Sequence, residues 1–256
     1  VVAVGEGVKH LQVGQNVACL SGTGGFGTHT IAPAALCMPL PPGFPAVDAA
    51  AFIMIYATSH HALVDRAQLK AGETVLVLGA AGGVGTAAIQ IAKALGARVI
   101  AAASSDEKCA LCTSIGADAT INYSKENLRE AIKTLTDGKG PDVIYDPVGG
   151  DFAEPAFRSI AWRGRYLVVG FASGPIPALP FNLALLTGAA IVAGFWGERA
   201  TREPKANAAM RADLAQWYGQ GKIKPVIDRT MPMAQLPQAY AHMGSRGVMG
   251  KLVMVN

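Results

Sequence analysis

Residues Val75–Lys108 read VLVLGAAGGVGTAAIQIAKALGARVIAAASSDEK, and this stretch decides the fold. An apolar run ends in a cluster of glycines, continues as a helical pattern, and leads into a second apolar run. Near-continuous apolar runs are typical of parallel strands that are covered on both faces. The stretch therefore predicts a strand–helix–strand unit with a tight turn where the first strand meets the helix.

The same alternation continues along the chain. Strands are expected at residues 74–79, 97–103, 118–122, 142–148, 165–171 and 189–195, and helices at residues 83–95, 105–115, 125–138 and 151–162. Right-handed crossovers between such strands produce an α/β fold with a doubly wound parallel sheet. Two βαβαβ halves indicate a Rossmann dinucleotide-binding fold, with its ligand at the carboxyl ends of the strands.

The two ends of the chain differ from this pattern. Residues 1–50 contain short alternating runs bounded by Gly and Pro, which predict part of a β-rich domain. Residues 51–196 form the expected dinucleotide-binding domain. Residues 197–256 are expected to return to the β-rich domain.

Composition narrows the class of protein. Half of the 256 residues are hydrophobic and 16% are charged, so a large core is available and disorder is not expected. The net charge is +4 without a dense basic run, which argues against a nucleic-acid partner. Four scattered cysteines suggest a reducing, cytoplasmic compartment.

The apolar stretch Ala178–Gly197 has the length of a membrane span. Pro180, Asn182 and Gly188 divide it, so a buried helix followed by a buried strand is the preferred interpretation. No membrane association is predicted.

The glycine turn predicts a pyrophosphate site. Free N–H groups at a helix N-terminus bind phosphate, and side chains at the turn would hold the phosphate away. Gly85 would allow the helix to pack closely on the strand. The expected cofactor contacts in the turn are Gly79, Ala81, Gly82, Gly83 and Val84.

The end of the second strand bears on the choice of cofactor. NAD-preferring sites have an acidic residue there for the ribose 2′-hydroxyl, but this chain has Ala103–Ser105. Ser104 and Lys108 would instead suit a 2′-phosphate, which favours NADPH over NADH. Asp106 and Glu107 complicate this interpretation, although acids also suit the first turn of a helix.

The motifs together carry a family resemblance. The segments VGEGVKHLQVGQNVA, GAAGGVGTAAIQIAKALGARVIA, DVIYDPVGGD, GRYLVVGFASGPIP and GKLVMV occur in this order. In this the chain resembles the zinc-independent quinone oxidoreductase (zeta-crystallin-like) branch of the medium-chain dehydrogenase/reductase superfamily. The resemblance implies a GroES-like catalytic domain, an NADPH cofactor, no metal, and reduction of quinones or other conjugated carbonyl compounds. It also implies a homodimer, and the last strand of the sheet is a plausible edge for pairing with a second subunit.

Further site residues follow from this resemblance. Lys108 and Tyr123 match residues at the 2′-phosphate, and Arg246 matches an arginine that reaches the cofactor from elsewhere in the chain. Thr58 matches a threonine near the nicotinamide and is the candidate catalytic residue. The other residues expected around the nicotinamide and substrate are Val148, Gly149, Gly170, Phe171, Phe195 and Trp196.

The resemblance also leaves alternatives open. Members of the family carry further residues before the segment that begins this chain, so the catalytic domain is expected to lack its N-terminal part. An enoyl-thioester or alkenal reductase of the same superfamily is one alternative. A truncated protein that binds NADPH without turnover is another.

Three other groups of residues suggest chemistry less strongly. Cys109 and Cys112 have metal-ligand spacing but fall inside a predicted helix, where buried cysteines are the preferred interpretation. His60 and His61 are adjacent on a helix and point in different directions, so packing is favoured over proton donation. Asp146 is expected to hold the turn that follows it, in preference to acid–base work.

Overall fold

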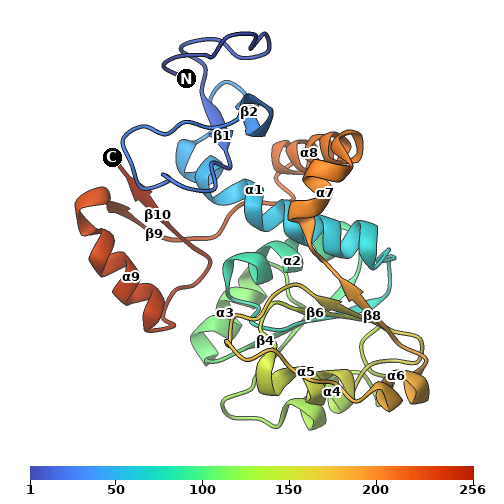
Figure 1. Ribbon diagram of the computed structural model, residues 1–256. Coiled ribbons are helices and arrows are strands. Elements are labelled where there is room, and N and C mark those ends of the chain that lie inside the picture. Colours follow the sequence, from blue (N-terminus) through green and yellow to red (C-terminus); the bar gives the residue numbers. More distant parts are fainter. The chain divides into compact units, whose positions relative to one another are not determined.

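The computed structural model describes residues 1–256 (Figure 1). The chain folds into two compact units. Unit 1 comprises Val1–Ile53 together with Ile227–Asn256, and unit 2 comprises Met54–Val226.

Unit 2 is built on a six-stranded parallel sheet in the order β5-β4-β3-β6-β7-β8. This confirms the predicted doubly wound α/β fold, because the chain starts near the middle of the sheet and winds outward in both directions. The strands are β3 (Thr74–Val77), β4 (Arg98–Ala103), β5 (Ala119–Asn122), β6 (Val143–Asp146), β7 (Arg165–Val168) and β8 (Ala190–Ala193).

Helices cover both faces of this sheet. Figure 1 shows α4, α5 and α6 on one face and α2 on the other. Alternate strand residues such as Leu76, Ile100 and Ile144 point to the first face and are fully buried in a core with Ile132 and Phe157. The helices are α2 (Gly83–Ala94), α3 (Asp106–Ser114), α4 (Leu128–Leu135), α5 (Ala153–Phe157) and α6 (Phe181–Thr187).

Two helices are shorter than predicted. Helix α4 begins only after Asn127, whose side chain accepts hydrogen bonds from the N–H groups of Arg129 and Glu130. Helix α5 is a single turn preceded by the 3-10 turn η3 (Gly150–Phe152). Gly149 has a φ of +66°, so the chain turns sharply before it can enter a helix.

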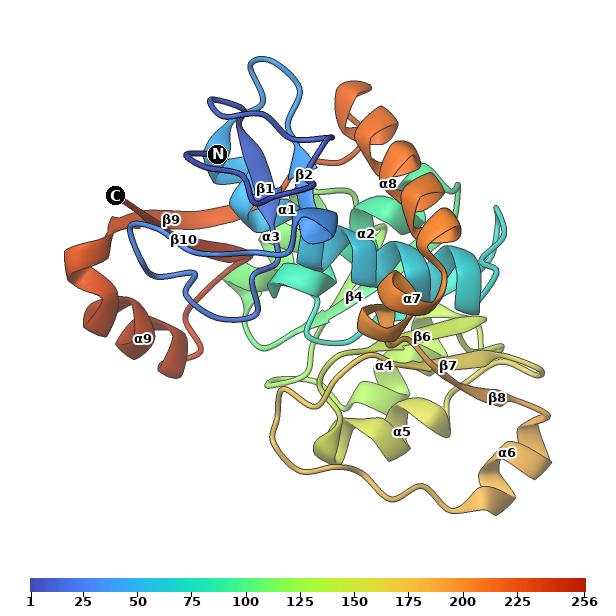
Figure 2. The same ribbon diagram turned by 45° about the horizontal axis from the view of Figure 1, so that its top comes forward.

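The stretch 178–197 forms the predicted helix and strand, but the expectation that both are buried is wrong. Side chains of α6 and β8 are open to solvent, including Phe181 (87% exposed), Leu185 (81%) and Ile191 (44%). The reason is topological, because β8 is an edge strand and pairs only with β7 (Figure 2).

A helix begins at Ala46 and continues as α1 (Ala46–His60) and the π-helix η2 (His61–Arg66). The sequence places His60 and His61 on a helix but does not predict the π turn, in which the Ala67 N–H donates to the Ala62 carbonyl oxygen at 2.9 Å. Ala46–Arg66 is long and apolar enough to cross a membrane, yet 67% of its apolar window is buried inside the fold. Such burial is typical of a core helix.

Helices α7 (Trp196–Arg202) and α8 (Pro204–Gly219) belong to unit 2. The sequence places the return to the β-rich domain at residue 197, whereas unit 2 extends to Val226. Trp196 ties the two helices together, because its indole N–H donates to Asn207 Oδ1 at 2.9 Å and both residues are buried.

Unit 1 contains less strand than the sequence suggests. Its N-terminal part has one antiparallel pair, and its C-terminal part has a parallel pair flanking a helix. Gly7, Gly14, Gly22 and Gly24 all adopt positive φ, so turns take up much of the first fifty residues. The elements are β1 (Val17–Cys19), η1 (Ala34–Leu36), β2 (Cys37–Pro39), β9 (Ile227–Pro232), η4 (Met233–Gln235), α9 (Leu236–Gly244) and β10 (Lys251–Val255).

Candidate functional site

The glycine turn lies between β3 and α2, where only small residues fit. A Cβ on Gly85 would lie 2.6 Å from the carbonyl oxygens of both Gly79 and Ala80. A Cβ on Gly79, whose φ is +56°, would lie 2.7 Å from Val148 Cγ2. The close packing predicted for Gly85 is therefore confirmed.

The turn leaves the start of α2 without a side-chain cap. Gly82 is the N-cap residue in an extended conformation, and no side chain accepts a hydrogen bond from the first turn of the helix. The Gly82 carbonyl accepts the Thr86 N–H at 2.8 Å, so the helix begins normally. The free N–H groups and the positive end of the helix dipole suit an anion at this point.

The strands on either side fix the turn at the switch point of the sheet. The Ala80 N–H donates to the Ala102 carbonyl in β4, and the Leu78 N–H donates to the Tyr145 carbonyl in β6, both at 3.0 Å. Strand β3 thus lies between the two halves of the sheet, where crevices for nucleotides form.

At the end of β4, Ser104 and Lys108 lie together. Lys108 Nζ donates to Ser104 Oγ at 3.2 Å, and both residues are half-buried. Ser105 caps α3 and accepts the Lys108 N–H at 3.3 Å. A hydroxyl and an ammonium group, both able to donate to an oxyanion, therefore share one position beside the glycine turn.

Tyr123 lies at the end of the neighbouring strand β5. Its N–H donates to the Ala103 carbonyl at 3.1 Å, and Ser124 Oγ donates to the Ser104 carbonyl at 2.9 Å. The Tyr123 ring packs against Phe152 with centroids 4.5 Å apart. The structure thus brings the ends of β4 and β5 together as the sequence suggests.

Asp106 does not act as the missing acid. Lys125 Nζ lies 2.5 Å from one carboxylate oxygen, and the Asn122 amide donates to the other at 2.6 Å. The hydrogen bond from Lys125, followed by that from Asn122, lowers the pKa of the Asp106 carboxyl. Lys125 therefore balances the charge of Asp106. Asp106 and Glu107 both lie in the first turn of α3.

Asp146 holds the turn after β6, as predicted. Its Oδ1 accepts the N–H groups of Val148 at 2.7 Å and Gly149 at 2.8 Å, and its Oδ2 accepts the Tyr166 hydroxyl. Burial and the nearby carboxylate raise the pKa of Tyr166 far above its usual range. Asp146 is 3% exposed and has both oxygens occupied, which leaves it unsuited to proton transfer.

The other residues predicted for the nicotinamide half lie at the ends of β6 and β7. A Cβ on Gly149 would lie 2.9 Å from Phe171 Cδ1, and a Cβ on Gly170 would lie 3.3 Å from the Pro147 carbonyl oxygen. The structure therefore brings Val148, Gly149, Gly170 and Phe171 together. Thr58 is half-buried in α1.

Two aromatic residues follow β8 and differ in exposure. Phe195 is 69% exposed and could meet a ligand. Trp196 is 5% exposed and donates to Asn207, and its position beside the substrate stays a prediction. Arg246 belongs to unit 1, where it follows α9 with a φ of +58°, and its contact with a cofactor stays a prediction.

The sequence did not identify a buried hydroxyl pair beneath the turn. Ser59 Oγ lies 2.8 Å from the Tyr145 hydroxyl and donates to the Val84 carbonyl at 3.1 Å. Burial raises the pKa of Tyr145 well above its usual range. These hydrogen bonds link α1 to the first turn of α2. No local sequence pattern predicts the pair, because Ser59 and Tyr145 are far apart in the chain.

His60, His61, Cys109 and Cys112 are all buried, which agrees with the packing roles that the sequence favours. His60 lies 5.4 Å from the Trp217 ring, whereas His61 Nδ1 lies 2.9 Å from Asp65. Burial lowers the pKa of both imidazoles, that of His60 to about 4. Cys109 and Cys112 are buried within α3, and burial raises both thiol pKa values, that of Cys112 to about 12.

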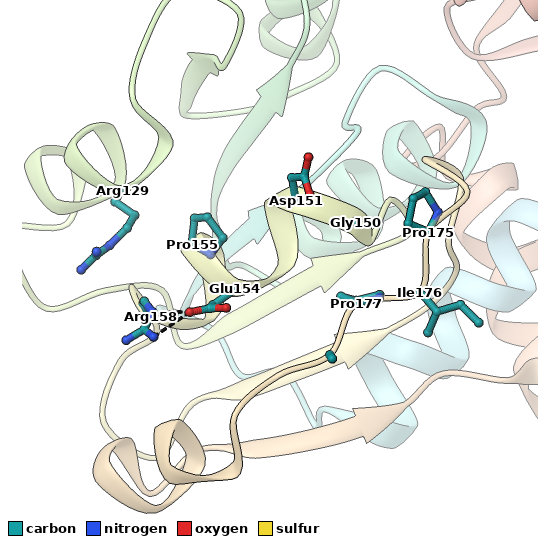
Figure 3. Close-up of a pocket in the computed structure, with 10 residues that line it drawn as sticks. Arg129, Gly150, Asp151, Glu154, Pro155, Arg158, Pro175, Ile176 and Pro177 are labelled. Atoms are coloured by element: carbon teal, nitrogen blue, oxygen red, sulfur yellow. Dashed lines mark hydrogen bonds and ion pairs between the residues drawn. The ribbon is translucent and has the colours of Figure 1, made fainter.

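A separate surface pocket of about 490 Å³ lies beside α5 and residues 175–178 (Figure 3). Arg129 and Arg158 border it, and Arg158 pairs with Glu154 at 2.6 Å. None of the predicted cofactor residues lines this pocket. It is therefore not part of the candidate site.

Comparisons with known proteins agree with this geometry. Residues 83–212 match a family model described as zinc-binding dehydrogenase. No three or more His, Cys, Asp or Glu side chains are grouped so that they could hold a metal ion.

Similar proteins include quinone oxidoreductase-like protein 2 of Bos taurus, 36% identical over 99% of this chain and 73% of the relative. Prostaglandin reductase-3 of Mus musculus is 33% identical over 99% of this chain and 70% of the length of that relative. The crystal structure of Escherichia coli quinone oxidoreductase complexed with NADPH matches with a TM-score of 0.91 at 27% identity, covering 100% of this chain and 79% of that one. The chain belongs to the quinone oxidoreductase branch of the medium-chain dehydrogenase/reductase superfamily.

Proposed function

We propose that the chain is an NADPH-dependent oxidoreductase that transfers hydride to a quinone or another conjugated carbonyl compound. One observation carries the proposal: the uncapped start of α2 lies beside a strand end that bears Ser104 and Lys108 in place of an acid. The NADPH complex of the Escherichia coli relative supports it.

The residues present fit this cofactor. Gly85 lets the start of α2 pack against the backbone of the turn, and the first turn of α2 offers N–H groups for a pyrophosphate. Ser104, Lys108 and Tyr123 would surround the 2′-phosphate. The pyrophosphate half would be held by Gly79, Ala81, Gly82, Gly83 and Val84.

The nicotinamide half would lie along the ends of β6 and β7. Gly149 and Gly170 allow the two strand ends to pack closely there, because Cβ atoms would meet Phe171 or the Pro147 carbonyl. Val148, Phe171 and Phe195 would supply apolar contacts. The family resemblance alone adds Arg246 to the proposed cofactor contacts.

The cofactor supplies the chemistry, and the chain supplies orientation and a pocket. Bound NADPH provides a hydride from C4 of its nicotinamide. Thr58 is the hydroxyl proposed to contact the reacting end. Asp146 is fully hydrogen-bonded, so solvent is proposed to protonate the reduced product. No metal takes part in this proposal.

An enoyl-thioester or alkenal reductase is the second candidate, and the similarity to prostaglandin reductase-3 favours it. Both candidates use the same cofactor site, so only the acceptor separates them. We further propose a cytoplasmic homodimer that pairs through the exposed edge of β8.

Titration with NADPH and NADH, followed by addition of 1,4-benzoquinone, an alkenal or an enoyl thioester, tests the proposal. NADPH is expected to bind more tightly than NADH and to be oxidised when quinone is added. Oxidation by the alkenal or thioester alone would favour the second candidate. Tight binding without any oxidation would indicate a nucleotide-binding protein without turnover.

Gly82→Val offers a specific control for the glycine turn. The branched side chain would stand at the N-cap of α2 and block the pyrophosphate, so neither cofactor should bind. Unchanged affinity would place the pyrophosphate elsewhere.

A further inference from the structure

Two cysteines face each other in unit 1. Strands β1 and β2 pair antiparallel, and Cys19 lies directly opposite Cys37 in the register. Directly opposed residues in such a pair have Cα atoms about 4.5–5.5 Å apart and side chains on the same face. That separation lies within the range that a disulfide spans.

The two thiols also interact with one another. The pKa of Cys37 is raised, first by burial and then by the neighbouring Cys19 thiol. Cys37 Sγ lies 3.5 Å from the Pro33 carbonyl oxygen. Both cysteines are partly exposed and in the free thiol form, so a small reagent can reach them.

We infer that Cys19 and Cys37 form a redox-active dithiol that small disulfides, such as oxidised glutathione, convert into a reversible cross-strand disulfide. The opposed register of the two cysteines carries this inference, and their partial exposure supports it. It is independent of the proposed hydride transfer.

The reaction balances as two successive exchanges. The Cys19 thiolate attacks one sulfur of the small disulfide, breaks its S–S bond and releases one small thiolate. Cys37 then loses its proton and attacks the Cys19 sulfur, which expels the second small thiol. The protein loses two electrons and two protons in total, and the small disulfide is reduced to two thiols.

The order of these steps follows from the chemistry of the pair. The raised pKa of Cys37 leaves less of it as thiolate, so Cys19 is the expected first nucleophile. Thiol–disulfide exchange runs in both directions, so small thiols can reduce the bridge by the reverse of these steps. The bridge is therefore expected to respond to the thiol–disulfide balance.

The bridge would alter a short and weakly supported hairpin. Strands β1 and β2 contribute only three residues each. They enclose residues 20–36, which include Gly22 and Gly24 at positive φ. A covalent link between Cys19 and Cys37 would close this loop and hold its two ends together even after a cut within it.

The other two cysteines provide an internal control. Cys109 and Cys112 are three residues apart on α3, but both are buried and burial raises the pKa of both thiols. Their thiols should resist the same oxidant while the chain is folded.

The test equilibrates the folded chain in buffers of graded reduced and oxidised glutathione, followed by acid quenching and alkylation. Trypsin and chymotrypsin are then used together, because cleavage after Phe26 separates the two cysteines unless a disulfide joins them. Mass spectrometry should find the joined peptides in oxidising buffers, and dithiothreitol should separate them.

Single cysteine variants test which residues form the disulfide. Cys19→Ser and Cys37→Ser should each abolish the joined peptides and leave the remaining cysteine as a glutathione adduct. Cys109→Ser should leave the joined peptides unchanged. On a non-reducing gel, a cut within residues 20–36 should separate fragments of the reduced chain but not of the oxidised chain.

Three results would overturn the inference. Cys19 and Cys37 could remain fully alkylated in the most oxidising buffer. Both could accumulate as separate glutathione adducts. A bridge between Cys109 and Cys112 could form in place of the proposed one.

Discussion

Lys108 Nζ donates a hydrogen bond to Ser104 Oγ at 3.2 Å, and this contact links the first turn of α3 to the end of β4. The residue usually expected at this strand end in an NAD site is an acid. Here Asp106, which begins the helix after this strand end, is bonded to Lys125 and Asn122. Ser104 and Lys108 therefore offer a hydroxyl and an ammonium group to a 2′-phosphate, while the Asp106 carboxylate is bonded to other residues.

Lys108→Ala should weaken NADPH binding by about 1–3 kcal/mol, the range for hydrogen bonds to charged groups. NADH lacks the 2′-phosphate, so its affinity should hardly change. Calorimetric titration with both cofactors measures the difference.

Lys133→Ala provides the matched control, because Lys133 is an exposed lysine on α4. It should leave both affinities unchanged. Equal losses for NADPH and NADH in Lys108→Ala would contradict the assignment of Lys108 to the phosphate.

The parallel sheet and the glycine turn could be predicted because local patterns encode them. Apolar runs mark the strands, and the small residues from Gly79 to Gly85 mark the turn. Asp146 could also be assigned to its turn, because an aspartate that ends a strand can accept the N–H groups that follow it.

The remaining features depend on partners that are distant in sequence. The role of Trp196 is set by Asn207 on another helix, and the pair of Ser59 and Tyr145 is set by sheet packing. The edge position of β8, which carries the exposed Ile191, depends on the order of the whole sheet. No local pattern contains this information.

Gly85→Ala should destabilise unit 2 by about 1–3 kcal/mol, the usual cost of overpacking. The new methyl group would lie 2.6 Å from two carbonyl oxygens, so α2 must move away from β3. Denaturant unfolding measures the loss, and cofactor affinity should fall as well.

Gly219→Ala is the matched control, because a Cβ on Gly219 meets no atom within 4 Å. Its effect should stay within about 0.5 kcal/mol, as for most surface changes. A similar stability for both variants would show that the close contact at Gly85 is not needed.

Tyr166→Phe should cost about 1–3 kcal/mol of unfolding free energy, because it leaves a buried Asp146 oxygen without its donor. Tyr145→Phe removes a hydroxyl that is equally buried. Ser59 keeps its bond to the Val84 carbonyl in that variant, so the cost should be smaller. Equal losses in chemical denaturation would argue against a special role for the bond to Asp146.

The edge of β8 predicts the oligomeric state. Ile191 is 44% exposed on a strand that pairs on one side only, and Phe181 and Leu185 of α6, the helix before β8, are also exposed. The chain should sediment as a dimer, and Ile191→Lys should shift it to a monomer. Met243→Lys changes an exposed apolar residue of α9 and should leave the dimer intact. A monomeric parent chain would contradict pairing through β8.

His60 should make stability depend on pH. Its pKa is lowered to about 4, first by burial, whereas an unfolded histidine titrates near 6.5. Between these values the unfolded chain binds more protons than the folded chain, so stability falls as pH falls from about 6.5 to 4. Asp213 and Asp65 favour the charged form, and Arg199 and His61 oppose it, but burial is the largest cause.

His60→Gln should therefore flatten the fall in unfolding free energy by up to about 3 kcal/mol at pH 4. His10→Gln changes an exposed histidine and should leave the slope as it is. Parallel pH profiles for the parent chain and His60→Gln would show that His60 becomes protonated in the folded chain as easily as in the unfolded one.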